Sequence, residues 1–115
     1  MTTYQTIEPK ILEMSEQMKR LAFMNRDEIF EFIATIVSLS DELNRFVRDL
    51  DLKTAQAEKE AFEMACSNKM NASLTSMAVK QSTSAIKADK DWANKQIGLL
   101  SEMRIAALAA QRGAE

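Results

Sequence analysis

The residues from 29 to 50 carry the clearest hydrophobic pattern in the chain. Their apolar side chains recur at intervals of four, three, four, three and four residues, which is the spacing of a helix that packs lengthwise on another helix. The residues at these intervals are Phe32, Ile36, Leu39, Leu43, Phe46 and Leu50. Ile33 and Val37 widen the stripe beyond what a two-stranded coiled coil requires. The pattern therefore predicts an amphipathic helix with more than one partner helix.

Local signals place the predicted helix boundaries. Asn25 and Glu28 have the spacing of a capping box and mark the start of this central helix. Thr6 is expected to cap the first helix, with Pro9 in its opening turn. The apolar rhythm lapses near 49–54, but no Gly or Pro forces a break there, so the second and third helices can also be continuous with at most a kink. Weak helix formers predict a turn within 81–84. The predicted helices span 6–24, 26–51, 54–80 and 85–111.

The pattern and the composition together predict an all-α fold. No segment alternates apolar and polar residues as a half-buried strand does. The 115 residues include only two Gly and one Pro, which leaves little turn chemistry for a sheet protein. A chain of this length suits one domain with one core. We expect a single all-helical domain over residues 1–115, a helical hairpin or coiled-coil bundle completed by oligomerisation.

The apolar stripes also predict where copies or partners would meet. Two long helical arms are not expected to cover each other's stripes within one chain, so the sequence predicts a homodimer or higher oligomer, with another protein as a further partner. Trp92 fits two roles, a half-buried anchor of the hairpin or an exposed interaction residue. The predicted interface residues are Phe32, Ile36, Leu39, Leu43, Phe46, Trp92 and Met103.

The segment between Met64 and Ala88 contains no acidic residue. It carries Lys69, Lys80 and Lys87 among Ser, Thr and Asn, and these lysines are the candidate phosphate contacts. The alternative is a poorly packed helix end and loop, because the lysines have no aromatic residues between them. The whole chain has a net charge of −2, which gives it no general attraction to nucleic acid.

Several kinds of chemistry have no residues to support them. The chain has no histidine, so the commonest general base and metal ligand is missing, and no Gly-rich phosphate loop is present. Its single cysteine, Cys66, allows neither an internal disulfide nor a structural zinc site, and its apolar neighbours predict a small core residue. We therefore expect a non-enzymatic protein without metal or cofactor.

The expected location follows from the apolar runs. No stretch of about twenty apolar residues could cross a bilayer, and the N-terminus has no apolar run able to act as a signal sequence. The sequence predicts a cytoplasmic protein that does not act in a membrane.

Residues 49–110 have a recognisable layout. An arm rich in Ala, Glu and Lys leads into a polar middle and then a returning arm, which includes Leu100, Ser101, Glu102, Met103 and Arg104. This half of the chain resembles small coiled-coil proteins encoded beside recombination and single-strand-binding genes in tailed bacteriophages. The resemblance implies an accessory role in phage-type DNA recombination or replication, in the host cytoplasm, and it carries over no functional residue.

A second function class stays open beside this adaptor hypothesis. Acidic charge, a hairpin layout and Met-rich faces also fit a small secretion or assembly chaperone that holds a helical segment of an exported or structural partner. Neighbouring genes would separate the two, since flagellar or needle-complex genes would favour the chaperone.

Overall fold

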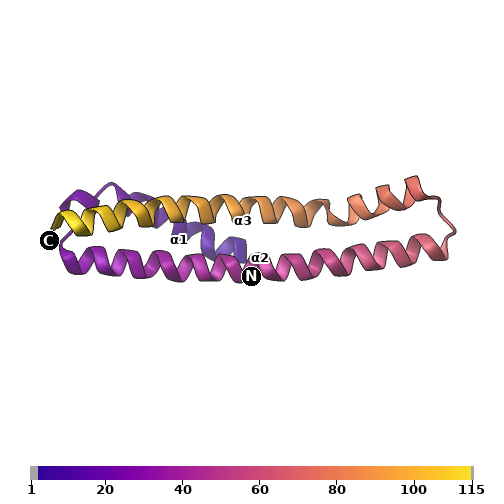
Figure 1. Ribbon diagram of the computed structural model, residues 1–115, viewed down its shortest axis with the longest axis horizontal. Coiled ribbons are helices and arrows are strands. Elements are labelled where there is room, and N and C mark those ends of the chain that lie inside the picture. The colour runs from indigo at the N-terminus through magenta and orange to yellow at the C-terminus, as the bar shows by residue number, and fades with distance from the viewer. Residues whose placement is uncertain (1–2, 115) are drawn as a thin grey trace. The chain divides into compact units, whose positions relative to one another are not determined.

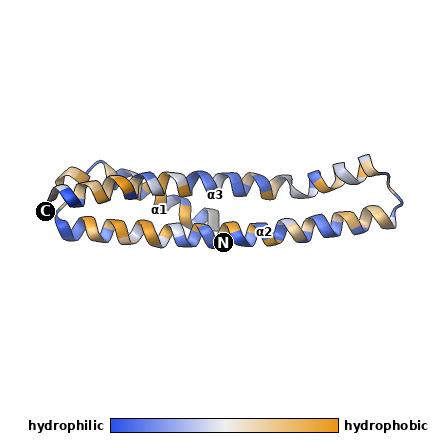
Figure 2. Ribbon diagram, viewed as in Figure 1, coloured by the Kyte–Doolittle hydropathy of each residue, from blue (hydrophilic) through white to orange (hydrophobic). Residues whose placement is uncertain are grey.

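The computed structural model describes residues 3–114 and confirms the all-α prediction. Helical residues make up 93 % of this range, and no strand occurs in it. The elements in order are α1 (Thr3–Met18), the short 3₁₀ helix η1 (Leu21–Phe23), α2 (Arg26–Ser67) and α3 (Ala72–Ala114), as Figure 1 shows. Apolar and polar turns alternate along α2 and α3 (Figure 2).

The chain divides into two compact units. Unit 1 contains the described residues up to Arg45 and those from Asn94 onward, and unit 2 contains Phe46–Ala93. Unit 1 therefore combines α1, η1, the first part of α2 and the last part of α3. Unit 2 is an antiparallel hairpin formed by the rest of α2 and α3 (Figure 1).

Unit 1 holds most of the buried apolar side chains. Of the 14 that are buried in the described part of the chain, 11 belong to unit 1 and come from all three of its helices. They are Ile7, Ile11, Met14, Ile29, Phe32, Ile36, Leu39, Leu43, Leu100, Met103 and Ala107. α1 thus supplies, within the same chain, apolar cover that the sequence assigned to a second copy.

Unit 2 buries fewer apolar side chains than unit 1. Only Leu50, Ala65 and Ala93 are buried among its described residues, and two of these are alanines. The rings of Phe46 and Trp92 contact each other between the two arms in an edge-to-face arrangement. Their centroids lie 6.3 Å apart and their planes form an angle of 79°. Trp92 is half-buried, as the anchor role requires.

One ion pair also joins the two arms of unit 2. Lys90 Nζ lies 2.6 Å from Asp51 Oδ1, and both side chains remain partly exposed. Solvent-exposed pairs of this kind contribute about 0–1 kcal/mol, so this ion pair adds little to the stability of the hairpin.

The capping box at the start of α2 is confirmed. The Glu28 N–H donates to Asn25 Oδ1 over 2.9 Å, and the Asn25 N–H donates to Glu28 Oε1 over 3.3 Å. Each side chain therefore satisfies a backbone N–H that the helix leaves without a partner.

α2 does not end at 51, so the predicted bounds 26–51 are wrong, and the continuous helix that the sequence left open is the one observed. The helix continues to Ser67. The Thr54 hydroxyl bonds the Leu50 carbonyl over 2.8 Å, and the Gln56 amide donates to the Glu60 carboxylate over 2.8 Å, so polar side chains in this stretch bond within the helix. The lapse in apolar rhythm changes what α2 buries and does not interrupt its backbone.

The turn predicted within 81–84 is also wrong, because the chain reverses at 68–71 instead. α3 continues through 81–84, where the Ser82 and Thr83 hydroxyls bond the Val79 carbonyl over 2.8 and 3.0 Å. Hydroxyls that bond a carbonyl one turn back are compatible with a helix interior. Residues 54–80 are accordingly not one helix, since they span the end of α2 and the start of α3.

Two capping motifs build the turn at 68–71. Lys69 has a left-handed backbone, with φ of 54°. The Met70 N–H bonds the Ala65 carbonyl over 2.9 Å and the Lys69 N–H bonds the Cys66 carbonyl over 3.1 Å, the paired bonds of a Schellman motif. Asn71 then caps α3, because its Oδ1 accepts the Leu74 N–H over 2.9 Å.

The first helix also differs from its prediction of 6–24. α1 begins by Thr3, so Thr6 does not cap it and Pro9 lies more than one turn inside it. α1 ends at Met18, and the chain passes through η1 to Asn25.

Lys69→Gly is expected to stabilise the protein. A side chain in the left-handed region costs about 1–2 kcal/mol, and glycine avoids this cost at the end of a helix. We expect thermal unfolding, followed by circular dichroism, to shift upward by about 4 °C or more. Lys69→Ala removes the same charge but keeps the Cβ that makes the left-handed backbone unfavourable, so it should leave the melting temperature nearly unchanged. An equal increase for both variants would contradict the explanation.

Candidate partner-binding surfaces

The predicted interface residues lie inside the folded chain. Phe32, Ile36, Leu39, Leu43 and Met103 are buried in unit 1, and Phe46 and Trp92 are half-buried in unit 2. The five buried side chains already pack within one chain, whereas Phe46 and Trp92 keep part of their surface exposed, and their contact with a partner stays a prediction.

The candidate phosphate contacts are all exposed. Lys69 lies in the turn of the hairpin, whereas Lys80 and Lys87 lie on α3. Seven residues correspond to about two helical turns, so Lys80 and Lys87 share one side of α3. Unit 2 contains as many acidic as basic residues. The basic residues are Arg48, Lys53, Lys59, Lys69, Lys80, Lys87 and Lys90, and the acidic residues are Asp49, Asp51, Glu58, Glu60, Glu63, Asp89 and Asp91.

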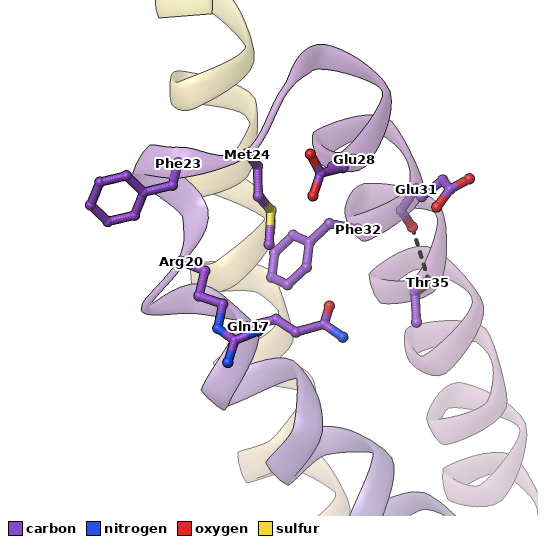
Figure 3. A pocket seen from close by; sticks show the side chains of 8 residues that line it. All are labelled: Gln17, Arg20, Phe23, Met24, Glu28, Glu31, Phe32 and Thr35. Atoms are coloured by element: carbon purple, nitrogen blue, oxygen red, sulfur yellow. Dashed lines mark hydrogen bonds between the residues drawn. The ribbon is translucent and has the colours of Figure 1, made fainter.

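A first cavity lies in unit 1 where η1 leads into α2. It measures about 550 Å³ and is lined by Gln17, Arg20, Phe23, Met24, Glu28, Glu31, Phe32 and Thr35. Figure 3 shows the Met24 side chain directed toward the Phe32 ring and the Phe23 ring directed away from the cavity. Phe23 is 88 % exposed. The cavity therefore combines apolar side chains with the guanidinium of Arg20 and the carboxylates of Glu28 and Glu31.

A second cavity is a groove between the two arms of unit 2, which we name the hairpin groove. It measures about 660 Å³, and its lining is mainly Ala and Met. The lining residues are Ala57, Glu60, Ala61, Met64, Ala65, Asn68, Met70, Ala78, Gln81 and Ser82. Glu60 is the one charged residue among them, and Met64 is 67 % exposed. The hairpin groove has the apolar lining and few polar groups that are typical of a binding surface.

The hairpin groove was not predicted from the sequence. Its signal is the series Ala57, Ala61 and Ala65, which places small residues on one side of α2 at intervals of four. The prediction for Cys66 was also wrong, because this side chain is exposed. Cys66 directly follows the buried Ala65, and neighbouring helical positions point about 100° apart.

Among residues 3–114, no three His, Cys, Asp or Glu side chains gather closely enough to hold a metal ion. None of the helices described above combines the length and apolar character needed to cross a membrane.

Comparison with known proteins gave no significant similarity. No protein-family profile matches the chain, and neither a curated protein nor a solved structure matches it. The fold therefore defines the class of protein, which is an all-α protein built on a helical hairpin.

Proposed function

We propose that this protein is a non-enzymatic helical adaptor that binds another protein through unit 2. The observation that supports the proposal is the hairpin groove, which has a volume of about 660 Å³, a mainly apolar lining and the exposed Met64 at its border. Phe62, Leu74 and Met77 are further exposed apolar side chains of this unit. Exposed apolar surface bordered by polar residues is a common mark of protein–protein interaction sites.

The setting that we propose is phage-type DNA recombination or replication, in the host cytoplasm, with the protein as an accessory factor. The phage resemblance of residues 49–110 supports this setting. The balanced charge of unit 2 favours a protein as the direct partner, because binding along a nucleic-acid backbone depends on net positive charge. Direct phosphate contacts by Lys69, Lys80 and Lys87 remain a prediction.

A specific observation keeps the chaperone as a second candidate. Met64 and Met77 are both more than half exposed, and flexible thioether side chains can pack against varied apolar sequences. A chaperone of this kind would hold a helical segment of an exported or structural protein in an apolar groove.

Affinity capture tests the proposal. The tagged wild-type protein should retain a partner after nuclease treatment, and the double variant Phe62→Ser with Met64→Ser should retain at least about tenfold less. Leu12→Ser is the matched control, because Leu12 is an exposed apolar residue of unit 1. A DNA-metabolism protein among the partners would support the adaptor, and an exported protein would support the chaperone. Equal retention by all variants, or none above the tag alone, would contradict both.

Self-association belongs to the same proposal. A second copy could cover the exposed Phe62 and Leu74 of unit 2, and a two-fold dimer is the commonest closed oligomer. Two copies of 13.0 kDa would give about 26 kDa by light scattering coupled to size exclusion. A mass of one chain at micromolar concentration would reject the homodimer.

A further inference from the structure

α1 shows how a third helix lies against α2 in unit 1. Residues of both helices line a small cavity of about 340 Å³ between them. They are Lys10, Glu13, Met14 and Gln17 of α1, and Thr35, Ser38, Leu39 and Glu42 of α2. Met14 and Leu39 are both buried. The side of α2 that carries Leu39 and Glu42 is therefore the side that α1 covers.

Residues of unit 2 lie on the same side of the α2 helix as Leu39 and Glu42. Eighteen residues correspond to about five full turns, so a residue 18 positions along an α-helix points in the same direction. Leu39 is matched by Ala57, Glu42 by Glu60 and Leu43 by Ala61. These three residues of unit 2 all line the hairpin groove.

The two segments of α2 differ in side-chain volume. Leu39 and Leu43 are buried in unit 1, and alanine stands at both corresponding positions in unit 2. Well-packed proteins leave few voids, so a groove of about 660 Å³ beside two alanines is space that a partner's side chains can fill. The α2 surface that α1 covers in unit 1 is thus repeated in unit 2 with room for a larger apolar side chain.

We propose that the hairpin groove binds an amphipathic helix of a partner protein, which lies along α2 as α1 does. The partner helix places Leu, Ile or Met side chains, spaced three or four residues apart, over Ala57 and Ala61. It places Lys or Arg beside Glu60. This inference rests on the proposed function and names the chemistry of the partner.

The charge of the groove selects a basic helix. Glu60 is its one charged lining residue, and the adjoining cavity of about 620 Å³ is lined by Glu60, Glu63, Met64, Ser67 and Asn68. Glu60 already accepts a hydrogen bond from Gln56 over 2.8 Å, and a carboxylate has room for further donors.

The same acidic border argues against a second copy in the groove. A two-fold dimer would bring the same surface of both chains together, and the border would then face its own carboxylates. Any homodimer therefore uses another part of the surface.

A synthetic helix tests the inference on the full-length protein. The probe is a fluorescein-labelled 16-residue peptide of Leu, Ala and Lys, with Leu at positions i, i+3, i+4 and i+7. We expect micromolar binding by fluorescence anisotropy. The counterpart with Glu in place of Lys should bind at least about fivefold more weakly.

Three variants locate the binding site. Glu60→Lys should weaken binding of the Lys peptide about fivefold, whereas Glu58→Lys, the same charge change on the other side of α2, should not. Ala61→Leu fills the groove and should weaken binding about tenfold, with unchanged circular dichroism as the control for folding. Because Glu60→Lys alters an exposed side chain, it remains informative if Ala61→Leu fails to fold.

The other outcomes overturn the inference. Equal weakening by Glu58→Lys would indicate general charge attraction, and absence of peptide binding would show that the groove does not hold such a helix. A dimer mass abolished by Ala61→Leu would make a second copy the occupant. If affinity capture succeeds while the groove variants retain every partner, this inference fails and the proposed function stands. If capture also fails, both fail.

Discussion

Leu43→Asp is expected to unfold unit 1. Leu43 is fully buried, so the substitution removes a packed leucine and leaves an unpaired carboxylate in the core. Together these effects should cost more than about 4 kcal/mol, a large part of the stability of an average domain. Urea denaturation followed by circular dichroism measures the loss.

The control for this variant lies two residues away. Asp41 is exposed, and Asp41→Asn should change the free energy of unfolding by less than about 0.5 kcal/mol. If Leu43→Asp kept the melting temperature and hydrodynamic size of the wild type, the helix from 29 to 50 would not organise the core.

Ile11→Asp is expected to detach α1 from unit 1. Ile11 is 3 % exposed, and a carboxylate at this position would be buried against the other helices of the unit. We expect a loss of about 3–5 kcal/mol and, because α2 loses its cover, increased binding of a hydrophobic dye. Denaturation and dye fluorescence measure the two effects.

The adjacent residue supplies a matched control for Ile11→Asp. Leu12 is 63 % exposed and points about 100° away from Ile11, so Leu12→Asp introduces the same charge on an exposed side of α1. Its stability should stay within about 0.5 kcal/mol of wild type. Equal damage from both variants would mean that helix disruption, and not loss of cover, explains the first result.

Local features of the fold could be predicted from the sequence. The capping box of Asn25 and Glu28 depends on residues three positions apart, and the structure contains both of its hydrogen bonds. The apolar spacing from Phe32 to Leu50 identified a helix side that is buried except for the half-buried Phe46. Both are properties of one helix and need no knowledge of the rest of the chain.

The position of the hairpin turn could not be predicted in the same way. Helix propensities differ by only tenths of a kcal/mol among ordinary residues, so the Ser and Thr residues near 82 did not require a break. The left-handed position at the end of α2 is occupied by Lys69, whereas glycine is the residue that usually marks such a helix end. Pairing of the two arms, with Phe46 beside Trp92 and Asp51 beside Lys90, agrees only with a turn near 68–71.

The sequence by itself determined that the chain is helical, where α2 starts, and which side of its first half is buried. Only the tertiary structure decided what covers that side, because an apolar stripe requires a cover without specifying whether it comes from the same chain or another. In unit 1, α1 and α3 both contribute side chains to the core that buries the stripe, whereas in unit 2 alanines of α2 line the open hairpin groove. The groove depends on volumes contributed by two helix segments, and no single stretch of sequence contains that information.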